Sequence, residues 1–136
     1  MIEYISYSEA LKDGNIKIQL SETYGYIGLV KLCIPPLVSS DQHIVVEIRV
    51  QEIDKTYNNP HRVLNRFNFN LYQKIYFNKV SEHTILWQKL DSSTNEINMT
   101  FVDEYGSPII VSDGKYSNVD FTLALMPRNS EWINKI

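Results

Sequence analysis

The feature that most constrains the fold is a period-two alternation of apolar and polar side chains in residues 96–126. Two segments carry it, INMTF at 97–101 and VDFTLAL at 119–125. Because successive side chains of a strand point to opposite faces of a sheet, each segment predicts a strand with one buried face. Between them, DEYGSP at 103–108 and SDGK at 112–115 supply residues that favour tight turns.

Similar patterns elsewhere predict short strands separated by turns. Besides the two segments above, the expected strands are 1–7 (at a sheet edge), 15–21, 24–34, 44–51, 62–71, 75–77 and 85–90. Residues 8–12 (SEALK) predict one helical turn ended by Asp13-Gly14, and 91–95 (DSSTN) predict a loop. Helical periodicity is otherwise almost absent. The predicted fold class is therefore all-β: an antiparallel β-sandwich, jelly-roll-like, with about eight strands.

Residues 24–34 differ from the other predicted strands because they are apolar on both faces. This composition predicts either a central strand of a sheet or a strand covered by a neighbouring subunit. Pro35 and Pro36 end the strand, because proline has no N–H to donate to a ladder. One face would carry Tyr26, Val30 and Leu32, and the other Ile27, Leu29 and Cys33.

The composition is that of an ordinary globular domain. The 136 residues are 43% hydrophobic and 21% charged, so we expect one domain over residues 1–126 and a C-terminal tail over 127–136. A formal charge of −3 with scattered Lys and Arg provides no basic face, so specific nucleic-acid binding is not expected. No apolar stretch approaches the roughly twenty residues that span a bilayer, and the first residues lack a signal-peptide pattern.

Cys33 is the single cysteine, and it lies in an apolar run between Leu32 and Ile34. One thiol cannot form an intrachain disulfide, so we expect the core to stabilise the fold. Two interpretations exist, a reactive nucleophile and a small buried hydrophobe. The apolar flanks favour the buried hydrophobe.

The other residues that could carry chemistry form no recognisable site. His43, His61 and His83 are far apart in the sequence and show none of the spacings that bind metals. Asp103 and Glu104 are adjacent, and adjacent residues of an extended chain point to opposite faces, so we expect a turn rather than acid–base chemistry. The sequence therefore predicts no catalytic, cofactor-binding or metal-binding residues, and a protein that is not an enzyme.

Aromatic residues are plentiful, with nine Tyr, five Phe and two Trp. The tyrosines allow two interpretations, scattered structural use or a platform for sugars or proteins, and the enrichment of Tyr in strands favours the first. Trp132 is isolated in the polar tail, so we expect it to anchor either on its own domain or on a partner. The tyrosines considered are Tyr4, Tyr7, Tyr24, Tyr26, Tyr57, Tyr72 and Tyr105.

An ordered set of motifs carries a family resemblance. The motifs are VLNR at 63–66, Tyr76-Phe77, Trp87, I-x-M-x-FVDEYGSPI at 97–109 and V-x-F-x-L-x-L at 119–125. They resemble the terminal strands of jelly-roll capsid proteins from double-stranded DNA viruses of the polinton, virophage and large-DNA-virus kind. The run YIGLVKLCIPP at 26–36 is similar to the apolar strand and proline turn near the start of such proteins. The resemblance covers about two-thirds of the chain.

The resemblance implies a single jelly-roll penton or minor capsid protein, because the chain is too short for a double jelly-roll major capsid protein. Such a protein would act as a homo-oligomer and through contacts to other capsid proteins. It would reside in the virion, and in the host cytoplasm or nucleus during assembly, without a cofactor. The regions expected to make contacts are 24–34, 54–60 and the tail around Trp132.

Two other classes of function remain open from the sequence. The first is a carbohydrate- or ligand-binding β-sandwich module that uses exposed tyrosines. The second is a small enzyme on a cupin-like scaffold, which would need His and carboxylate ligands clustered around a metal.

Overall fold

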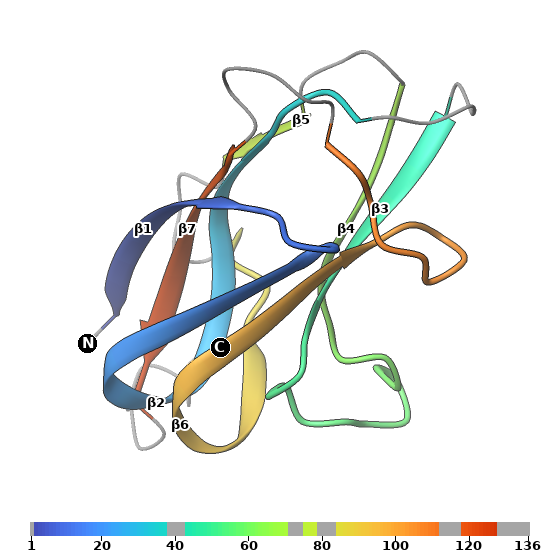
Figure 1. Ribbon diagram of the computed structural model, residues 1–136. Coiled ribbons are helices and arrows are strands. Elements are labelled where there is room, and N and C mark those ends of the chain that lie inside the picture. The colour runs from blue at the N-terminus through green and yellow to red at the C-terminus, as the bar shows by residue number, and fades with distance from the viewer. Residues whose placement is uncertain (1, 38–42, 71–74, 79–83, 112–117, 128–136) are drawn as a thin grey trace.

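The computed structural model describes residues 2–37, 43–70, 75–78, 84–111 and 118–127. These residues form seven strands and no α-helix, and every strand pairing is antiparallel. The all-β class predicted from the alternation is confirmed. The strands are β1 (Glu3–Ala10), β2 (Asn15–Ile34), β3 (His43–Val50), β4 (Val63–Asn70), β5 (Ile75–Asn78), β6 (Gln88–Val102) and β7 (Asn118–Met126) (Figure 1).

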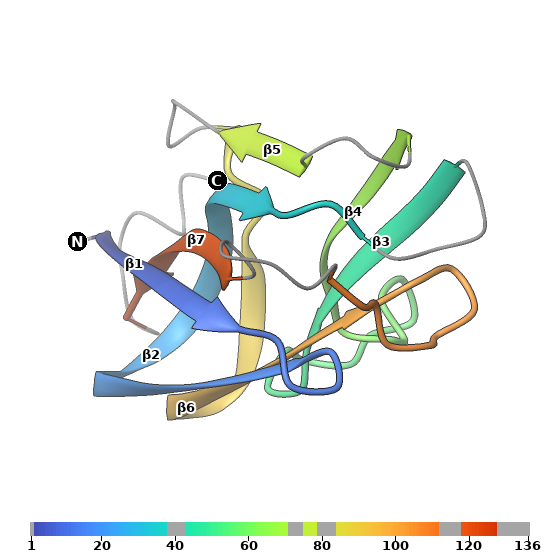
Figure 2. The same ribbon diagram turned by 45° about the horizontal axis from the view of Figure 1, so that its top comes forward.

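The two longest strands, β2 and β6, pass through both layers of a sandwich. Residues 15–19 of β2 pair with β6, which pairs with β3, and β3 pairs with β4. Residues 26–34 of β2 pair with β7 and β5, and β7 pairs with β1. The first two residues of β6 also reach this layer, where they pair with Tyr26 and Ile27. One layer is therefore β2-β6-β3-β4 and the other is β1-β7-β2-β5. Figure 2 shows β3 and β4 on the opposite side of the molecule from β1 and β7.

The strand order is that of a jelly roll. Counting the two halves of β2 separately turns the seven strands into eight. Numbered in chain order, the two layers then read 1-8-3-6 and 2-7-4-5, the double Greek-key arrangement of a jelly roll. The sequence predicted two separate strands, 15–21 and 24–34, where the structure has one bent strand.

Tyr24 lies at the corner where β2 turns from one layer to the other. The pairing of β2 with β6 shifts in register on both sides of this residue, as expected where a strand changes sheets. The Tyr24 side chain is buried, and its hydroxyl donates a hydrogen bond to the carboxylate of Glu3 on β1. Burial and this hydrogen bond raise the pKa of Tyr24. The Tyr24 hydroxyl therefore stays protonated, and its hydrogen bond to Glu3 holds the start of β1 at the corner of β2.

The hydrophobic core fills the space between the two layers. It is one cluster of 23 buried residues from both layers, with a few half-buried side chains packed against it. The alternation of apolar and polar residues in the sequence correctly predicted most of the core positions in β2, β6 and β7. The confirmed inward side chains are Ile16, Ile18, Leu20, Ile97, Met99, Phe101, Val119, Phe121, Leu123 and Leu125.

A β-bulge at Val30 reverses the faces of β2. The register with β7 shifts between Leu29 and Lys31, so one residue is extra in β2. Leu29 lies in the main core before the bulge, and Leu32 lies in it after the bulge. The predicted grouping of Val30 with Leu32 is therefore wrong, because a one-residue shift moves every later side chain to the other face.

The outer face of β2 is covered by the chain itself. Val30 packs there with Ile85 and Ala124 in a second small cluster, against which Trp87 and Ile2 also pack. The prediction that residues 24–34 form a central strand is confirmed. The covering side chains include Ile85 and Trp87 from the segment before β6.

Three local predictions are wrong. The helical turn expected at 8–12 is the end of β1, where Ser8 to Ala10 pair with β7. A single helical turn has a costly nucleus, whereas this ladder is supported by the stacking of Tyr7 on Phe121, with ring centroids 5.3 Å apart. The loop expected at 91–95 belongs to β6, where Thr94 pairs with Tyr24. The strand expected at 85–90 begins only at Gln88.

Asn65 is a buried polar residue on the core face of β4. It pairs with Ile48 of β3, which is fully buried, and its Oδ1 has no hydrogen-bond partner among the residues that the structure describes. An unsatisfied buried polar atom is destabilising, so we expect Asn65→Leu to raise the free energy of unfolding by about 1–2 kcal/mol in urea denaturation. Asn68→Leu, at an exposed position of the same strand, is the matched control and should change it by less than about 0.5 kcal/mol. A loss of stability in Asn65→Leu would contradict this account.

Candidate functional site

The tyrosines described by the structure do not form one platform. Tyr24 is buried, and Tyr7 and Tyr26 are half-buried. The exposed ones are Tyr4 on β1, Tyr57 in the loop 51–62 and Tyr105 in the turn after β6. These three lie on different connections and strands of the fold. Tyr72 and Trp132 lie outside the described residues.

The loop 51–62, which includes the expected contact region 54–60, is held in place by hydrogen bonds at its base. The side chain of Asn59 accepts a hydrogen bond from the N–H of Val63 (2.8 Å) and donates one to the Val63 carbonyl (2.9 Å). Arg62 has a left-handed backbone (φ 56°) and donates from Nε to the Ile53 carbonyl. Tyr57 is 99% exposed in this loop. The loop therefore exposes an aromatic side chain on a backbone that is held by hydrogen bonds.

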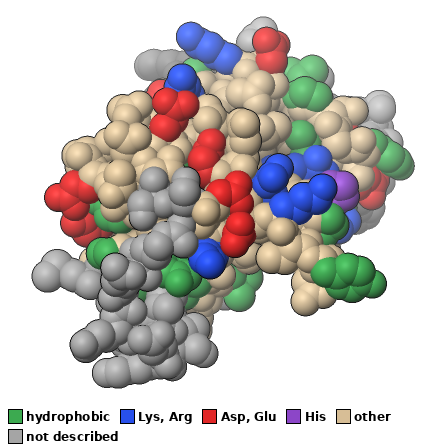
Figure 3. Space-filling view, turned by 90° about the horizontal axis from the view of Figure 1, so that it is seen from below, with side chains coloured by type: hydrophobic (Ala, Val, Ile, Leu, Met, Phe, Trp, Pro, Cys, Tyr) green, Lys and Arg blue, Asp and Glu red, His purple; other side chains and the backbone are tan. Residues whose placement is uncertain are grey.

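Charged side chains gather where this loop crosses β6. Ile53 forms an antiparallel bridge with Leu90, and both side chains are fully buried. Asp54 N–H donates to the Lys89 carbonyl, and Asp91 N–H donates to the Glu52 carbonyl. Neighbouring positions of a strand alternate in direction, so these charged side chains point outward together. Figure 3 shows acidic and basic side chains side by side on this end of the molecule.

The carboxylates of this cluster have different partners. Glu52 accepts hydrogen bonds from Asn98, at 2.7 Å from the backbone nitrogen and 2.8 Å from the side-chain nitrogen. Asp54 lies 4.0 Å from the ammonium of Lys89. A hydrogen bond to Asp54, followed by desolvation and the negative charge of Asp54, raises the pKa of Asp91. The protonated form of the Asp91 carboxyl is therefore favoured in these surroundings.

We expect Asp91→Asn to stabilise the protein at neutral pH. The raised folded-state pKa of Asp91 means that this group favours folding below the ordinary aspartate pKa of 3.8 and loses this contribution as pH rises through the raised value. The amide keeps a hydrogen-bond donor without the charge. Thermal unfolding from pH 3 to 7 should show that the stability of the variant relative to wild type increases as the pH rises, with no increase at the acid end. A constant difference across the range would contradict the raised pKa of Asp91.

The remaining candidates from the sequence have structural surroundings. Asp103 Oδ1 accepts hydrogen bonds from the N–H groups of Tyr105 and Ser107, both at 2.9 Å, which makes it a turn-forming carboxylate. Glu104 is exposed. His61 is exposed in the loop 51–62, whereas His83 and the side chain of His43 lie outside the described part of the chain.

Cys33 is partly exposed, so the expectation of a buried thiol is wrong. The bulge at Val30 is the physical reason, because it turns Cys33 to the outer face of β2. There it lies in a shallow groove of about 530 Å³ across β1, β7 and β2. Polar side chains share this groove, namely Ser6, Ser8, Lys31, Asp120 and Thr122.

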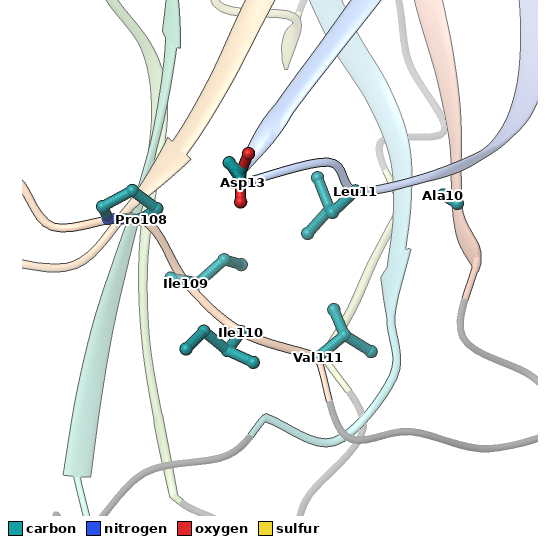
Figure 4. Close-up of a pocket in the computed structure, with 8 residues that line it drawn as sticks. Ala10, Leu11, Asp13, Pro108, Ile109, Ile110 and Val111 are labelled. Atoms are coloured by element: carbon teal, nitrogen blue, oxygen red, sulfur yellow. The ribbon is translucent and has the colours of Figure 1, made fainter.

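A second groove, which the sequence did not predict, has apolar lining side chains with the exception of Asp13, although nearly half of its surface is polar. It has a volume of about 540 Å³ and lies between the turn from β1 to β2 and the segment after Pro108 (Figure 4). Figure 4 shows Leu11 and Val111 on its two sides, pointing toward the same space. Ile110 is 63% exposed at this groove. The run PIIV at 108–111, apolar without alternation, was the available signal, but its proximity to Leu11 depends on the topology.

Comparison of the sequence with known protein families finds no matching family model, and comparison with curated proteins finds no similar protein. Among the residues that the structure describes, no three or more His, Cys, Asp or Glu side chains are grouped so that they could hold a metal ion. The described part of the chain also contains no helix that is long and apolar enough to cross a membrane.

Proposed function

We propose that this chain is a structural component of a viral capsid, either a penton or a minor capsid protein. It acts by associating with copies of itself and with neighbouring shell proteins. The observation that carries the proposal is the eight-strand jelly-roll order, together with the motifs at 97–109 and 119–125 that resemble capsid proteins. Because one fold serves many functions, the surfaces of this molecule must also support the proposal.

Its surfaces support association in two respects. Large apolar side chains are exposed at separate places, Tyr57 in the loop 51–62, Leu86 before β6 and Ile110 at the apolar groove. Several contacts around one subunit are what a closed shell requires, since each subunit meets different neighbours. The loop that carries Tyr57 is held by hydrogen bonds between Asn59 and Val63, and the segment that carries Ile110 is held by one from Ile109 N–H to the Phe101 carbonyl. Such surfaces enter a contact with little loss of conformational entropy.

Native mass spectrometry and electron microscopy of the purified protein at micromolar concentration test this proposal. We expect defined oligomers, or a defined complex when a shell partner is supplied. A strictly monomeric species that joins no shell protein would contradict it.

A second candidate function, the binding of a polar ligand such as a carbohydrate, has one observation in its favour. The outer groove across β1, β7 and β2 presents hydroxyl, amine and carboxylate groups from Ser6, Lys31 and Asp120. Calorimetric titration with a panel of sugars separates the two functions. Saturable binding that Asp120→Ala abolishes would favour the ligand-binding module, and the capsid function predicts no such signal.

A further inference from the structure

The apolar groove lies at the end of an edge strand. Ala10, the last residue of β1, and Leu11 line one side of the groove, and residues 109–111 line the other. Among the described strands, β1 pairs only with β7. Residues 8–10 therefore have a sheet edge that can accept another strand, and this stretch contains neither proline nor lysine, which commonly protect such edges. An apolar groove and an open edge thus meet at one place.

The chain contains a segment suited to this place. The tail 128–136, RNSEWINKI, lies outside the described residues and carries one large apolar anchor, Trp132, followed by Ile133 and Ile136. Tryptophan is the residue type most enriched among interface side chains that contribute much of the binding energy. If Trp132 lies at the groove beside Lys12, an antiparallel strand brings Lys135 level with Glu9, an exposed carboxylate of β1. The opposite charges of Lys135 and Glu9 then lie next to each other, in addition to the contact between apolar surfaces.

The tail of the same chain is too short to place Trp132 there. Ala10 pairs with Asn118, so the groove lies at the start of β7, whereas the tail leaves from its other end at Met126. From Met126 to the level of Leu11 is nine strand positions, about 30 Å. Trp132 is six residues beyond Met126, and six residues span at most about 22 Å when fully extended. A tail from another copy has no such limit.

We propose that Trp132 of a second copy occupies the groove between Leu11 and Ile110, with the residues after it extending along the end of β1. The inference rests on the self-association in the proposed function and names the contact that produces it. Each copy offers one groove and one tail, so the exchange is reciprocal in a dimer and continues around a larger ring. In either arrangement Ile110 is removed from water.

Two substitutions in the full-length chain break opposite halves of this contact. Trp132→Ala removes the anchor, and Ile110→Arg blocks the groove. By sedimentation velocity at a series of concentrations, we expect each to weaken association on the order of thirtyfold or more relative to wild type. Ser21→Arg is the matched control, because it places the same charge at an exposed position of β2 that lines neither groove, and it should leave association unchanged.

Mixing the two variants gives the decisive result. The Trp132→Ala chain keeps an intact groove and the Ile110→Arg chain keeps an intact tail, so an isotopically labelled mixture should form a 1:1 complex in native mass spectrometry. Near-ultraviolet circular dichroism confirms that each variant is folded. If Trp132→Ala associates like wild type, the inference fails while self-association stands. If wild type is monomeric at every concentration and with shell partners, the proposed function fails with it.

Discussion

Gly14→Ala is expected to lower the free energy of unfolding by about 3 kcal/mol or more, measured by urea denaturation. Gly14 is buried with φ +79°, a conformation that other L-residues adopt only at a cost. A Cβ at this position would lie 2.8 Å from Cβ of Pro108 and 2.9 Å from the carbonyl oxygen of Phe101. The Gly14 carbonyl also accepts a 2.8 Å hydrogen bond from Phe101 N–H. The backbone therefore cannot move away from the clash without losing this bond.

Gly106→Ala is the matched control for this prediction. Gly106 has nearly the same backbone angle, φ +82°, but nothing lies within 4 Å of the position that a Cβ would take. Only the conformational cost then applies, and we expect a loss of about 1 kcal/mol. Equal losses for the two variants would show that the close approach of residues 14, 101 and 108 contributes nothing to stability.

The second large effect is expected from Gly28→Ala in the centre of β2. A Cβ there would lie 2.3 Å from Cγ2 of Ile85, the side chain that covers the outer face of this strand. We expect a loss of about 2–3 kcal/mol in the free energy of unfolding, because Ile85 must leave its packed position beside Val30 and Ala124. Thermal or urea unfolding measures it.

A double-mutant cycle identifies the cause. Ile85→Ala removes the methyl group that clashes, so adding Gly28→Ala to it should cost at least about 1 kcal/mol less than adding the same change to wild type. Additive losses would show that the cost arises from the backbone of β2 rather than from the contact with Ile85.

Sequence periodicity predicted the fold well where strands are regular. The inward positions of β6 and β7 follow strict alternation, because the extra residue of the bulge beside β7 belongs to β2 and neither β6 nor β7 has one of its own over these residues. It failed beyond Val30, where a one-residue bulge exchanges the faces of β2. No glycine or proline marks that bulge, so its position follows from the pairing with β7 and not from local chemistry.

The candidate interaction surface could also be predicted only in part from the sequence. Trp132 and the loop around Tyr57 could be selected from the sequence because a large aromatic side chain in a polar segment is conspicuous. The groove could not be predicted, because Leu11 and Ile110 are separated by about a hundred residues and meet only through the jelly-roll topology. Local propensity also gave the wrong structure for residues 8–12, where pairing with β7 decides the conformation.

The corner in β2 has a mechanical consequence. In a sandwich held together only by side chains, a tensile force can peel one layer from the other by separating apolar surfaces. Here the backbones of β2 and β6 continue from one layer into the other and stay paired on both sides of the corner. A force that pulls the layers apart therefore acts on the covalent backbone and on backbone hydrogen bonds. The hydrogen bond from Tyr24 to Glu3 also connects the corner to the edge strand β1. In the capsid role that we propose, this continuity would keep the two layers of the subunit together under outward pressure.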